Sequence, residues 1–321
     1  MWMEEKDGQN QVFQYEPCKD GIRMIRCFAL YETERFVIPE KIAEMPVREI
    51  GPYAFSHAEG EKERRDGSSC LRAVGGNTLR EVICPDTLVR IGRLAWYNCE
   101  NLQKVAFYDT IDEIEDGAFK NCDGLCEITV YAVREKLNCM KQVLIDVEQK
   151  VSASVEYKKG RKKAKLVFPE FGYGFEENCP GRIFHEYTYG SGNSYRQCFY
   201  DGMIRYQRYD ELFSMATRED PKETVFEIAF NRLEYPYQLL ERDKKKYELY
   251  LREHKKEAGT IVVKNDDLHR LQMLFDWKIF KREDFEWLID LAGREHMISC
   301  LAWLMDQKLS IGMTKKKTFQ F

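Results

Sequence analysis

The stretch ENLQKVAFYDTIDEIEDGAFKNCDGLCEIT, residues 100–129, belongs to a pattern that recurs every 23 residues. Leucine returns at this step three times, as Leu79, Leu102 and Leu125. A Val or Ile follows three positions after each of these leucines. A repeat length in the twenties that begins with leucine is typical of a solenoid in which each repeat forms one coil.

One such repeat holds too few apolar residues to form a core alone, so neighbouring coils must cover it and the ends of the array need caps. The quoted unit is expected to point these side chains inward: Leu102, Val105, Phe107, Ile111, Ile114, Ala118 and Phe119. A looser copy occupies residues 36–55, where Ile50 stands for Ile91. The charged stretch at 57–69 is predicted to be an exposed loop.

Residues 11–30, QVFQYEPCKDGIRMIRCFAL, read as two strands joined by a Lys-Asp-Gly turn. This hairpin is predicted to cap the amino-terminal end of the solenoid. The motif L-x-x-V-x-x-P-x-x-L-x-x-I-G at 79–92 and the segment IPEKIAEMPVREIGPYAF at 38–55 resemble the BspA-type bacterial leucine-rich repeat. The resemblance covers roughly residues 10–131 and implies a solenoid fold.

Side chains alternate between the two faces of a strand, which assigns an outward set to each repeat. With Val105 and Phe107 inward, the residues predicted to face out and to bind are Glu81, Ile83, Lys104, Tyr108, Glu127, Thr129 and Tyr131, with Ala106 and Pro85 in the same phase. Because neighbouring strands lie about 4.8 Å apart, the two tyrosines are expected to stand side by side. This face suits protein binding; the alternative is a solvated face whose tyrosines pack on each other.

Residues 151–168 alternate around a basic tip and predict a β-hairpin. Six of the eight residues from Lys158 to Lys165 are basic, which makes this the one candidate patch for nucleic acid. The alternative is a charged tip that keeps a sheet edge from aggregating. The formal net charge of the chain is −4, so we expect no nucleic-acid partner.

Residues 168–213 are rich in Phe and Tyr, which predicts either a ligand groove or a core that joins the repeats to the rest of the chain. From residue 220 onward the apolar period approaches 3.6, which predicts helices. We expect them at 237–256, 266–277, 283–292 and 296–308, besides a first helix that ends before Pro236. The last three weakly resemble ankyrin-type helix pairs.

The candidate catalytic and metal-binding residues also admit structural roles. His185 and Cys198, with Asp201 nearby, could form a nucleophile pair only if they meet in space. Cys122 and Cys126, with Cys139 beyond, could suggest zinc, but Cys122 occupies the repeat position of Cys99 and so favours core packing. We therefore predict no catalytic residues, no metal site and no cofactor.

Eleven cysteines without a Cys-x-x-Cys pair indicate a reducing compartment. The amino terminus lacks the basic start and apolar run of a signal peptide, and no apolar run could span a membrane, so we expect a cytoplasmic protein.

The sequence as a whole predicts an α+β protein with three parts. These are a leucine-rich-repeat solenoid at 1–135, an aromatic-rich β-hairpin and α+β segment at 136–218, and a helical domain at 219–321. The predicted function is recognition of another protein through the strand face of the solenoid or the helical domain. The alternative is an enzyme or small-ligand site in residues 168–213, with the repeats as a targeting module.

Overall fold

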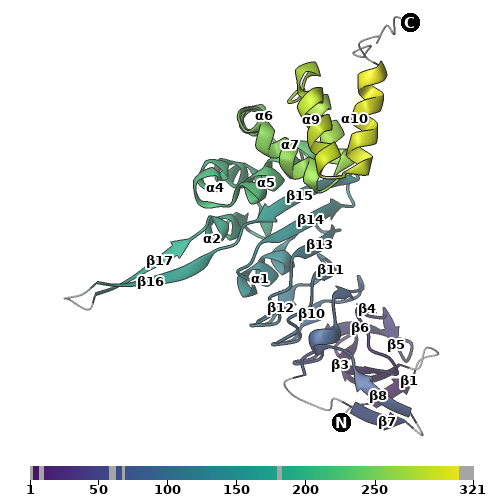
Figure 1. The fold of residues 1–321 in the computed structure, drawn as a ribbon. Helices are drawn as coiled ribbons and strands as arrows, with labels where there is room; N and C mark the ends of the chain where they lie inside the picture. Colours follow the sequence, from purple (N-terminus) through teal and green to yellow (C-terminus); the bar gives the residue numbers. More distant parts are fainter. Residues whose placement is uncertain (1–2, 7–10, 58–62, 67–68, 179–182, 311–321) are drawn as a thin grey trace, which may run out of the picture. The chain divides into compact units, whose positions relative to one another are not determined.

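The computed structural model describes residues 3–6, 11–57, 63–66, 69–178 and 183–310 (Figure 1). At 65–66, 69, 175–178 and 183–187 it describes the backbone alone. The chain forms two compact units: Met1–Asp220 with Tyr235–Gln238, and Pro221–Glu234 with Leu239–Phe321. The division of the chain into three parts at 135 and 218 stays a prediction.

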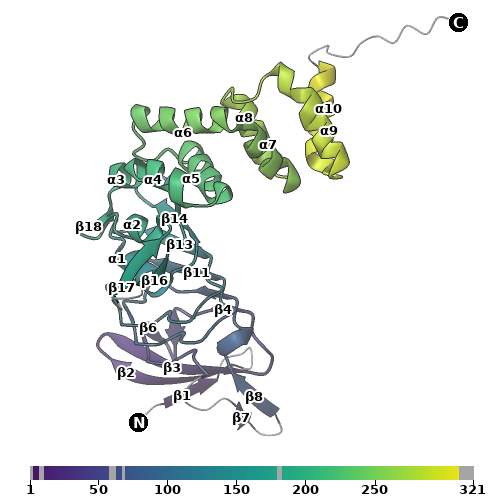
Figure 2. The ribbon, with the colours of Figure 1, turned by 60° about the vertical axis from the view of Figure 1, so that its left-hand side comes forward.

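The long sheet of the first unit carries the repeats. Its strands lie in the order β15, β14, β13, β11, β9, β4, and Figure 2 shows β14, β13, β11 and β4 in succession along one side of the solenoid. Their bounds are β4 (Arg35–Val37), β9 (Glu81–Ile83), β11 (Lys104–Tyr108), β13 (Glu127–Ala132), β14 (Val151–Tyr157) and β15 (Lys162–Phe168). All neighbours in this sheet are parallel except β14 and β15, which form the predicted antiparallel hairpin.

The 23-residue step of the sequence sets the register in which neighbouring strands of this sheet pair. Val105 pairs with Val82 on one side and with Ile128 on the other. Each repeating leucine is fully buried, and its amide donates to the carbonyl three residues earlier in every coil: Leu79 to Gly76, Leu102 to Cys99 and Leu125 to Cys122. All seven side chains predicted to point inward in the quoted unit are buried. The prediction of stacked coils is therefore confirmed.

A second sheet runs along the solenoid in the order β1, β2, β3, β6, β10, β12. The bounds of its strands and of those that pair beside them are β1 (Met3–Lys6), β2 (Val12–Cys18), β3 (Gly21–Ala29), β5 (Lys41–Ile42), β6 (Met45–Ile50), β7 (Glu63–Asp66), β8 (Ser69–Ala73), β10 (Arg90–Ile91) and β12 (Glu113–Ile114). Ile91 pairs with Ile50 and with Ile114, which confirms the looser copy at 36–55.

The amino-terminal hairpin is confirmed, because β2 and β3 pair around a turn at Lys19 and Asp20, and β3 then pairs with β6 of the first coil. The prediction of a loop over 57–69 is wrong in part. Strands β7 and β8 pair with each other, and β8 also pairs with β3. Residues 58–62 and 67–68 of that stretch lie outside the described residues.

Aromatic rings line up inside the coils, one from each. Phe55 stacks on Trp96 with ring centroids 5.0 Å apart, and Trp96 stacks on Phe119 at 4.8 Å. All three side chains are buried. Stacked rings in successive coils bury apolar area that no single repeat could cover, which is why the coils depend on one another.

The solenoid continues past the last leucine into the predicted aromatic segment. Helix α1 (Asn138–Asp146) separates β13 from β14, and α2 (Gly192–Arg196), α3 (Tyr206–Glu211) and α4 (Phe213–Glu219) follow β15 with two strand pairs. These pairs are β16 (Gly172–Asn178) with β17 (Ile183–Tyr189), and β18 (Phe199–Tyr200) with β19 (Met203–Ile204). Tyr209 covers the edge strand β15, because its hydroxyl accepts from the amide and donates to the carbonyl of Val167, each at 2.8 Å.

The second unit is helical. Its helices are α5 (Lys222–Glu234), α6 (Glu241–Glu253), α7 (Lys255–Lys264), α8 (Leu268–Asp276), α9 (Phe285–Arg294) and α10 (Ile298–Ser310). The predicted helices are confirmed within a few residues, whereas α7 was not predicted as a separate helix. Among the described helices, none combines the length and the apolar character that crossing a membrane requires.

Candidate functional site

The parallel register collects the predicted outward residues into rows that run across the strands. Lys104 lies between Glu81 and Glu127, and Ala106 lies between Ile83 and Thr129. Tyr108 pairs with Tyr131 in the third row. All seven residues predicted to form the binding face are half-buried or exposed, so their outward orientation is confirmed, while Pro85 is buried and its predicted outward position is wrong.

The tyrosine pair lies where β11 and β13 end. The ring centroids of Tyr108 and Tyr131 are 4.9 Å apart, with their planes tilted by 33°. Burial raises the pKa of Tyr108, and the negative charge of Asp86 raises it further. Tyr108 is therefore neutral at physiological pH. The two side chains together offer hydroxyl groups and an aromatic surface.

The charges in the first row neutralise one another. Arg35 forms an ion pair with Glu81 at 2.9 Å, and Lys104 forms one with Glu127 at 2.9 Å. The hydrogen bond to Glu127 raises the pKa of Lys104. Opposite charges that face each other across strands stabilise the pairing of the coils. This row therefore gives the face little net charge with which to select a partner.

A groove of about 720 Å³ lies beside the tyrosine pair, at the carboxyl ends of β11, β13 and β14. It is lined by Asp86, Tyr108, Thr110, Tyr131, Val133, Glu156, Tyr157, Lys158, Arg161, Lys162 and Lys163. The two tyrosines therefore line a concave site and do not stand alone on a flat face. Concave, partly apolar sites with a few polar groups are where proteins bind ligands.

The basic tip of the β14–β15 hairpin forms one end of the groove. Lys163 is engaged, since its amine lies 3.2 Å from Glu156 and 5.6 Å from the ring centroid of Tyr235. Lys162 lies over the ring of Tyr237 at 5.7 Å. In the part of the chain that the structure describes, exposed Lys158 and Arg161 have no ion-pair partner. These two cations are available to an anionic group.

The opposite end of the groove is acidic. Asp86 lines it on the coil of β9, and Glu40 lies close enough to Tyr108 to contribute to its raised pKa. Both carboxylates are exposed, and neither has an ion-pair partner within the described ranges. The groove thus carries opposite free charges at its two ends, with the tyrosines between them.

Asp109 holds the loop that borders the groove. Its buried carboxylate accepts hydrogen bonds from the amides of Val133 at 2.8 Å, Arg134 at 2.7 Å and Lys136 at 3.2 Å. A carboxylate that accepts from several amides fixes the course of a loop more firmly than a neutral acceptor does. Val133, which lines the groove, is thereby held in place.

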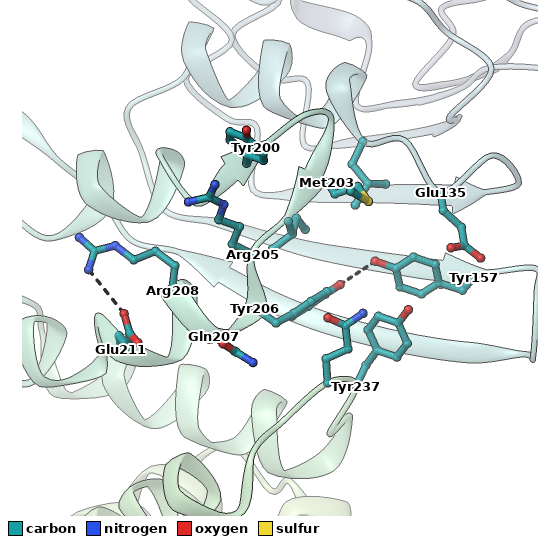
Figure 3. A pocket seen from close by; sticks show the side chains of 13 residues that line it. Glu135, Tyr157, Tyr200, Met203, Arg205, Tyr206, Gln207, Arg208, Glu211 and Tyr237 are labelled. Atoms are coloured by element: carbon teal, nitrogen blue, oxygen red, sulfur yellow. Dashed lines mark hydrogen bonds and ion pairs between the residues drawn. The ribbon is translucent and has the colours of Figure 1, made fainter.

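A second pocket, of about 520 Å³, lies around three tyrosines from different parts of the first unit (Figure 3). The hydroxyls of Tyr157 and Tyr206 are 2.8 Å apart, and Tyr237 stacks on Tyr157 with centroids 4.5 Å apart. Burial raises the pKa of Tyr157 to about 12. Arg205 lies over the ring of Tyr200 at 4.0 Å, and Arg208 pairs with Glu211 at 3.7 Å. These side chains of the pocket thus contact one another.

The aromatic segment is mostly core where its side chains are described. Phe168, Phe171, Tyr195, Tyr206, Tyr209 and Phe213 are buried, whereas Tyr173, Tyr189 and Tyr200 are exposed. The side chain of His185 lies outside the described ones. Its proposed partner Cys198 is buried, and burial raises the pKa of this thiol to about 12. A thiol in that state is not an activated nucleophile.

Two of the three cysteines that could suggest zinc, Cys122 and Cys139, belong to the core, and the third, Cys126, is exposed. Cys122 is buried, lies 3.2 Å from the carbonyl oxygen of Trp96, and has its pKa raised by burial. Burial raises the pKa of Cys139 to about 12. Among the described residues, no group of three or more His, Cys, Asp or Glu side chains is arranged to hold a metal ion.

Most of the groove residues that the sequence did not assign to this face come from the β14–β15 hairpin, and Asp86, Thr110 and Val133 are the others. Ile128 pairs with Ala153, and Tyr131 pairs with Glu156, a step of 25 residues that differs from the repeat. The alternation of 151–157 predicts a strand, but it does not predict the pairing of that strand with β13. The sequence predicts either a nucleic-acid patch or a charged sheet edge for the hairpin tip, whereas the parallel pairing of β13 with β14 places the tip beside the tyrosines.

A match to a protein-family model agrees with the coils described above. Residues 73–141 match the family model described as BspA type leucine rich repeat region (6 copies). No curated protein matches the chain. A leucine-rich repeat protein of T. pallidum is 24% identical, with 40% of this chain and 54% of that one covered, at a TM-score of 0.29.

Other solved structures give similar values. A leucine-rich cell surface protein of Faecalibacterium prausnitzii is 23% identical over 40% of this chain and 33% of its own, with a TM-score of 0.29. A leucine-rich repeat protein of Bacteroides capillosus is 25% identical over 39% and 80%, also at 0.29. The chain thus spans about half of the T. pallidum protein and a third of the Faecalibacterium protein. By the match to the family model, and by coils that keep the 23-residue register, residues 73–141 form a BspA-type leucine-rich repeat region.

Proposed function

We propose that this chain recognises another protein through the outer strand face of its solenoid. The observation that carries the proposal is the Tyr108–Tyr131 pair, which lines a groove at the end of the parallel sheet. Solenoids use such extended surfaces to bind partners. Tyrosine is enriched among the residues that contribute most to protein interfaces, because it buries a large ring and keeps a polar hydroxyl.

A merely solvated face is the alternative, and the charges argue against it. The ion pairs Arg35–Glu81 and Lys104–Glu127 occupy the first row, while the tyrosines lie in the third row next to a concavity. A partner that covers the tyrosines therefore does not need to break these pairs. A row of neutralised charge beside an aromatic pair suits the centre of an interface, where aromatic residues are enriched.

The test is capture of partners from a lysate of the native host with the full chain as bait. A variant with Tyr108→Ala and Tyr131→Ala is compared with Tyr31→Ala, which removes an exposed tyrosine elsewhere on the same unit. We expect the double variant to lose a specific partner that the wild type and Tyr31→Ala retain. Equal capture by all three proteins, each with an unchanged thermal unfolding curve, would contradict the proposal.

In this proposal the partner is a cytoplasmic protein and the helical residues 219–321 form a separate domain that can add a second docking surface. The described cysteines are free and most are buried, which supports a reducing setting. The described side chains of residues 168–213 give no support to the enzyme alternative, since Cys198 is a buried and protonated thiol.

A further inference from the structure

We propose that the groove beside the tyrosine pair binds an extended peptide segment with a basic residue at one end, apolar or aromatic residues in the middle and an acidic residue at the other end. The inference rests on the proposed function, because it names the chemical class of the partner for the same face. It follows from three features of the groove: where its free charges lie, how far apart they are, and what lies between them.

The free charges are separated along the sheet. Asp86 belongs to the coil of β9, while Lys158 and Arg161 belong to the tip between β14 and β15. The sheet order places β11 and β13, with Tyr108 and Tyr131, between these two ends. A peptide that crosses the strands thus meets carboxylates first, then two aromatic rings, then two cations.

The other charges of the groove do not disturb this polarity. Glu156 is neutralised by Lys163, and Lys162 lies over the ring of Tyr237. Once these internal contacts are set aside, the remaining charges at the two ends of the groove are opposite in sign. A ligand with complementary ends gains attraction at both, and one with the wrong sign at either end is repelled there.

The length of the ligand follows from the strand spacing. The coils of β9 and β14 are three strand positions apart in the sheet. At about 4.8 Å per strand this is roughly 14 Å. An extended chain advances about 3.3 Å per residue, so about four residues separate the two charged ends of the ligand.

The acidic end distinguishes a peptide from a nucleic acid. Aromatic rings next to lysine and arginine would also suit a single-stranded nucleic acid. Such a chain carries a phosphate at every nucleotide and would place negative charge against Asp86 and Glu40 as well as against Lys158. Opposite charges at the two ends therefore favour a peptide.

The experiment measures binding of the full chain to an array of hexapeptides. Lys or Glu occupies each end in all four combinations, and the four central positions vary among apolar and aromatic residues. We expect peptides with opposite end charges, in one orientation, to bind at least about tenfold more tightly than Lys–Lys or Glu–Glu peptides with the same centre. A labelled uridine decamer serves as the nucleic-acid probe.

Charge reversal at one end gives the decisive comparison. In Lys158→Glu with Arg161→Glu both ends of the groove are acidic, so we expect the preference to move to Lys–Lys peptides by a similar factor. Lys19→Glu with Lys120→Glu changes the net charge equally at exposed positions that do not line the groove, and should keep the wild-type preference. A shift in preference, in contrast to a loss of binding, cannot arise from misfolding.

The inference is wrong if no peptide binds, or if all peptides bind equally whatever their end charges. It is also wrong if the uridine decamer binds more tightly than the peptides and the variant Lys158→Glu with Arg161→Glu abolishes that binding. The outcome also separates the two proposals. If alanine at Tyr108 and Tyr131 abolishes capture of the native partner while the array shows no charge preference, the proposed function stands and this inference fails. If capture survives the alanine changes, the proposed function itself fails.

Discussion

At the scale of single residues, Arg196 closes the carboxyl-terminal end of the solenoid. Its buried guanidinium donates to backbone carbonyls from separate segments: Leu144, Val147, Gln149, Pro169 and Gly192. It also lies over the ring of Phe171 at 4.8 Å. Burial lowers the pKa of Arg196 to about 10, so the group remains protonated at neutral pH. The planar fork of arginine is what allows one side chain to reach so many carbonyls.

We predict that Arg196→Met destabilises the first unit by about 3 kcal/mol or more, because several buried carbonyls lose their donor at once. Arg196→Lys is expected to recover only part of this loss, since an ammonium has three donors without the planar geometry. Urea unfolding measures both. Arg218→Met, at an exposed position of α4, is the control and should change stability little. Equal stability of Arg196→Met and the control would contradict this role.

At the scale of elements, the loop after β13 shows how one repeat position can have two different roles. Asp86 and Asp109 are 23 residues apart and therefore equivalent in the repeat. Asp86 is exposed in the groove, whereas Asp109 is buried and binds three amides of residues 133–136. The difference arises because the chain after β13, which Asp109 contacts, leads into helix α1 and no longer repeats. The buried carboxylate of Asp109 accepts the hydrogen bonds of this loop where a further regular coil is absent.

We expect Asp109→Asn to destabilise the first unit by roughly 2 kcal/mol, because the amide group presents a donor where amides of the loop need an acceptor. Hydrogen exchange should accelerate at Val133, Arg134 and Lys136 more than at other amides of the sheet. Asp123→Asn, at an exposed position, provides the matched control. Unchanged exchange at these three amides would show that Asp109 does not hold the loop.

At the scale of the whole molecule, the chain divides into two compact units whose stabilities rest on different interactions. The first unit depends on coils that cover one another. The second depends on packed helices and their caps, of which Asp266 is an example. Its carboxylate accepts from the amides of Ser299 at 3.1 Å and Cys300 at 2.8 Å at the start of α10. The bond from the Cys300 amide is the main cause that lowers the pKa of Asp266 to about 2.

The pKa of Asp266 predicts how the helical unit responds to acid. A carboxyl whose pKa is lower in the folded state stabilises that state above its ordinary pKa of about 3.9. This contribution is lost as the pH falls toward 2. We therefore expect the unfolding free energy of the helical unit to fall between pH 5 and pH 2, and to fall by less in Asp266→Asn than in the wild type. Circular dichroism at 222 nm follows the unfolding. Asp306→Asn, exposed on α10, should keep the wild-type slope.

The coils could be predicted from the sequence because burial at a fixed step is a local property of the chain. Leucines 23 residues apart, with alternating residues after them, specify which side chains face inward whatever lies beyond the repeat. Val82, Val105 and Ile128 meet as expected, and so do Tyr108 and Tyr131. The orientation of the predicted face is thus confirmed, while its role in binding stays a prediction.

The groove could not be predicted in the same way. Its basic end belongs to a hairpin that joins the sheet after helix α1, and the step from Ile128 to Ala153 breaks the repeat. Its acidic end depends on the burial of Asp109 and the exposure of Asp86, which are the same residue type at the same repeat position.

The sequence by itself determined the period of this protein, its inward residues and the hairpins at 11–30 and 151–168, because each follows from apolar residues at regular local spacing. The tertiary structure alone decided which charges are left without partners around the tyrosines. Free charge depends on which distant side chains come within a few ångströms of one another, and no periodicity along the chain encodes that distance.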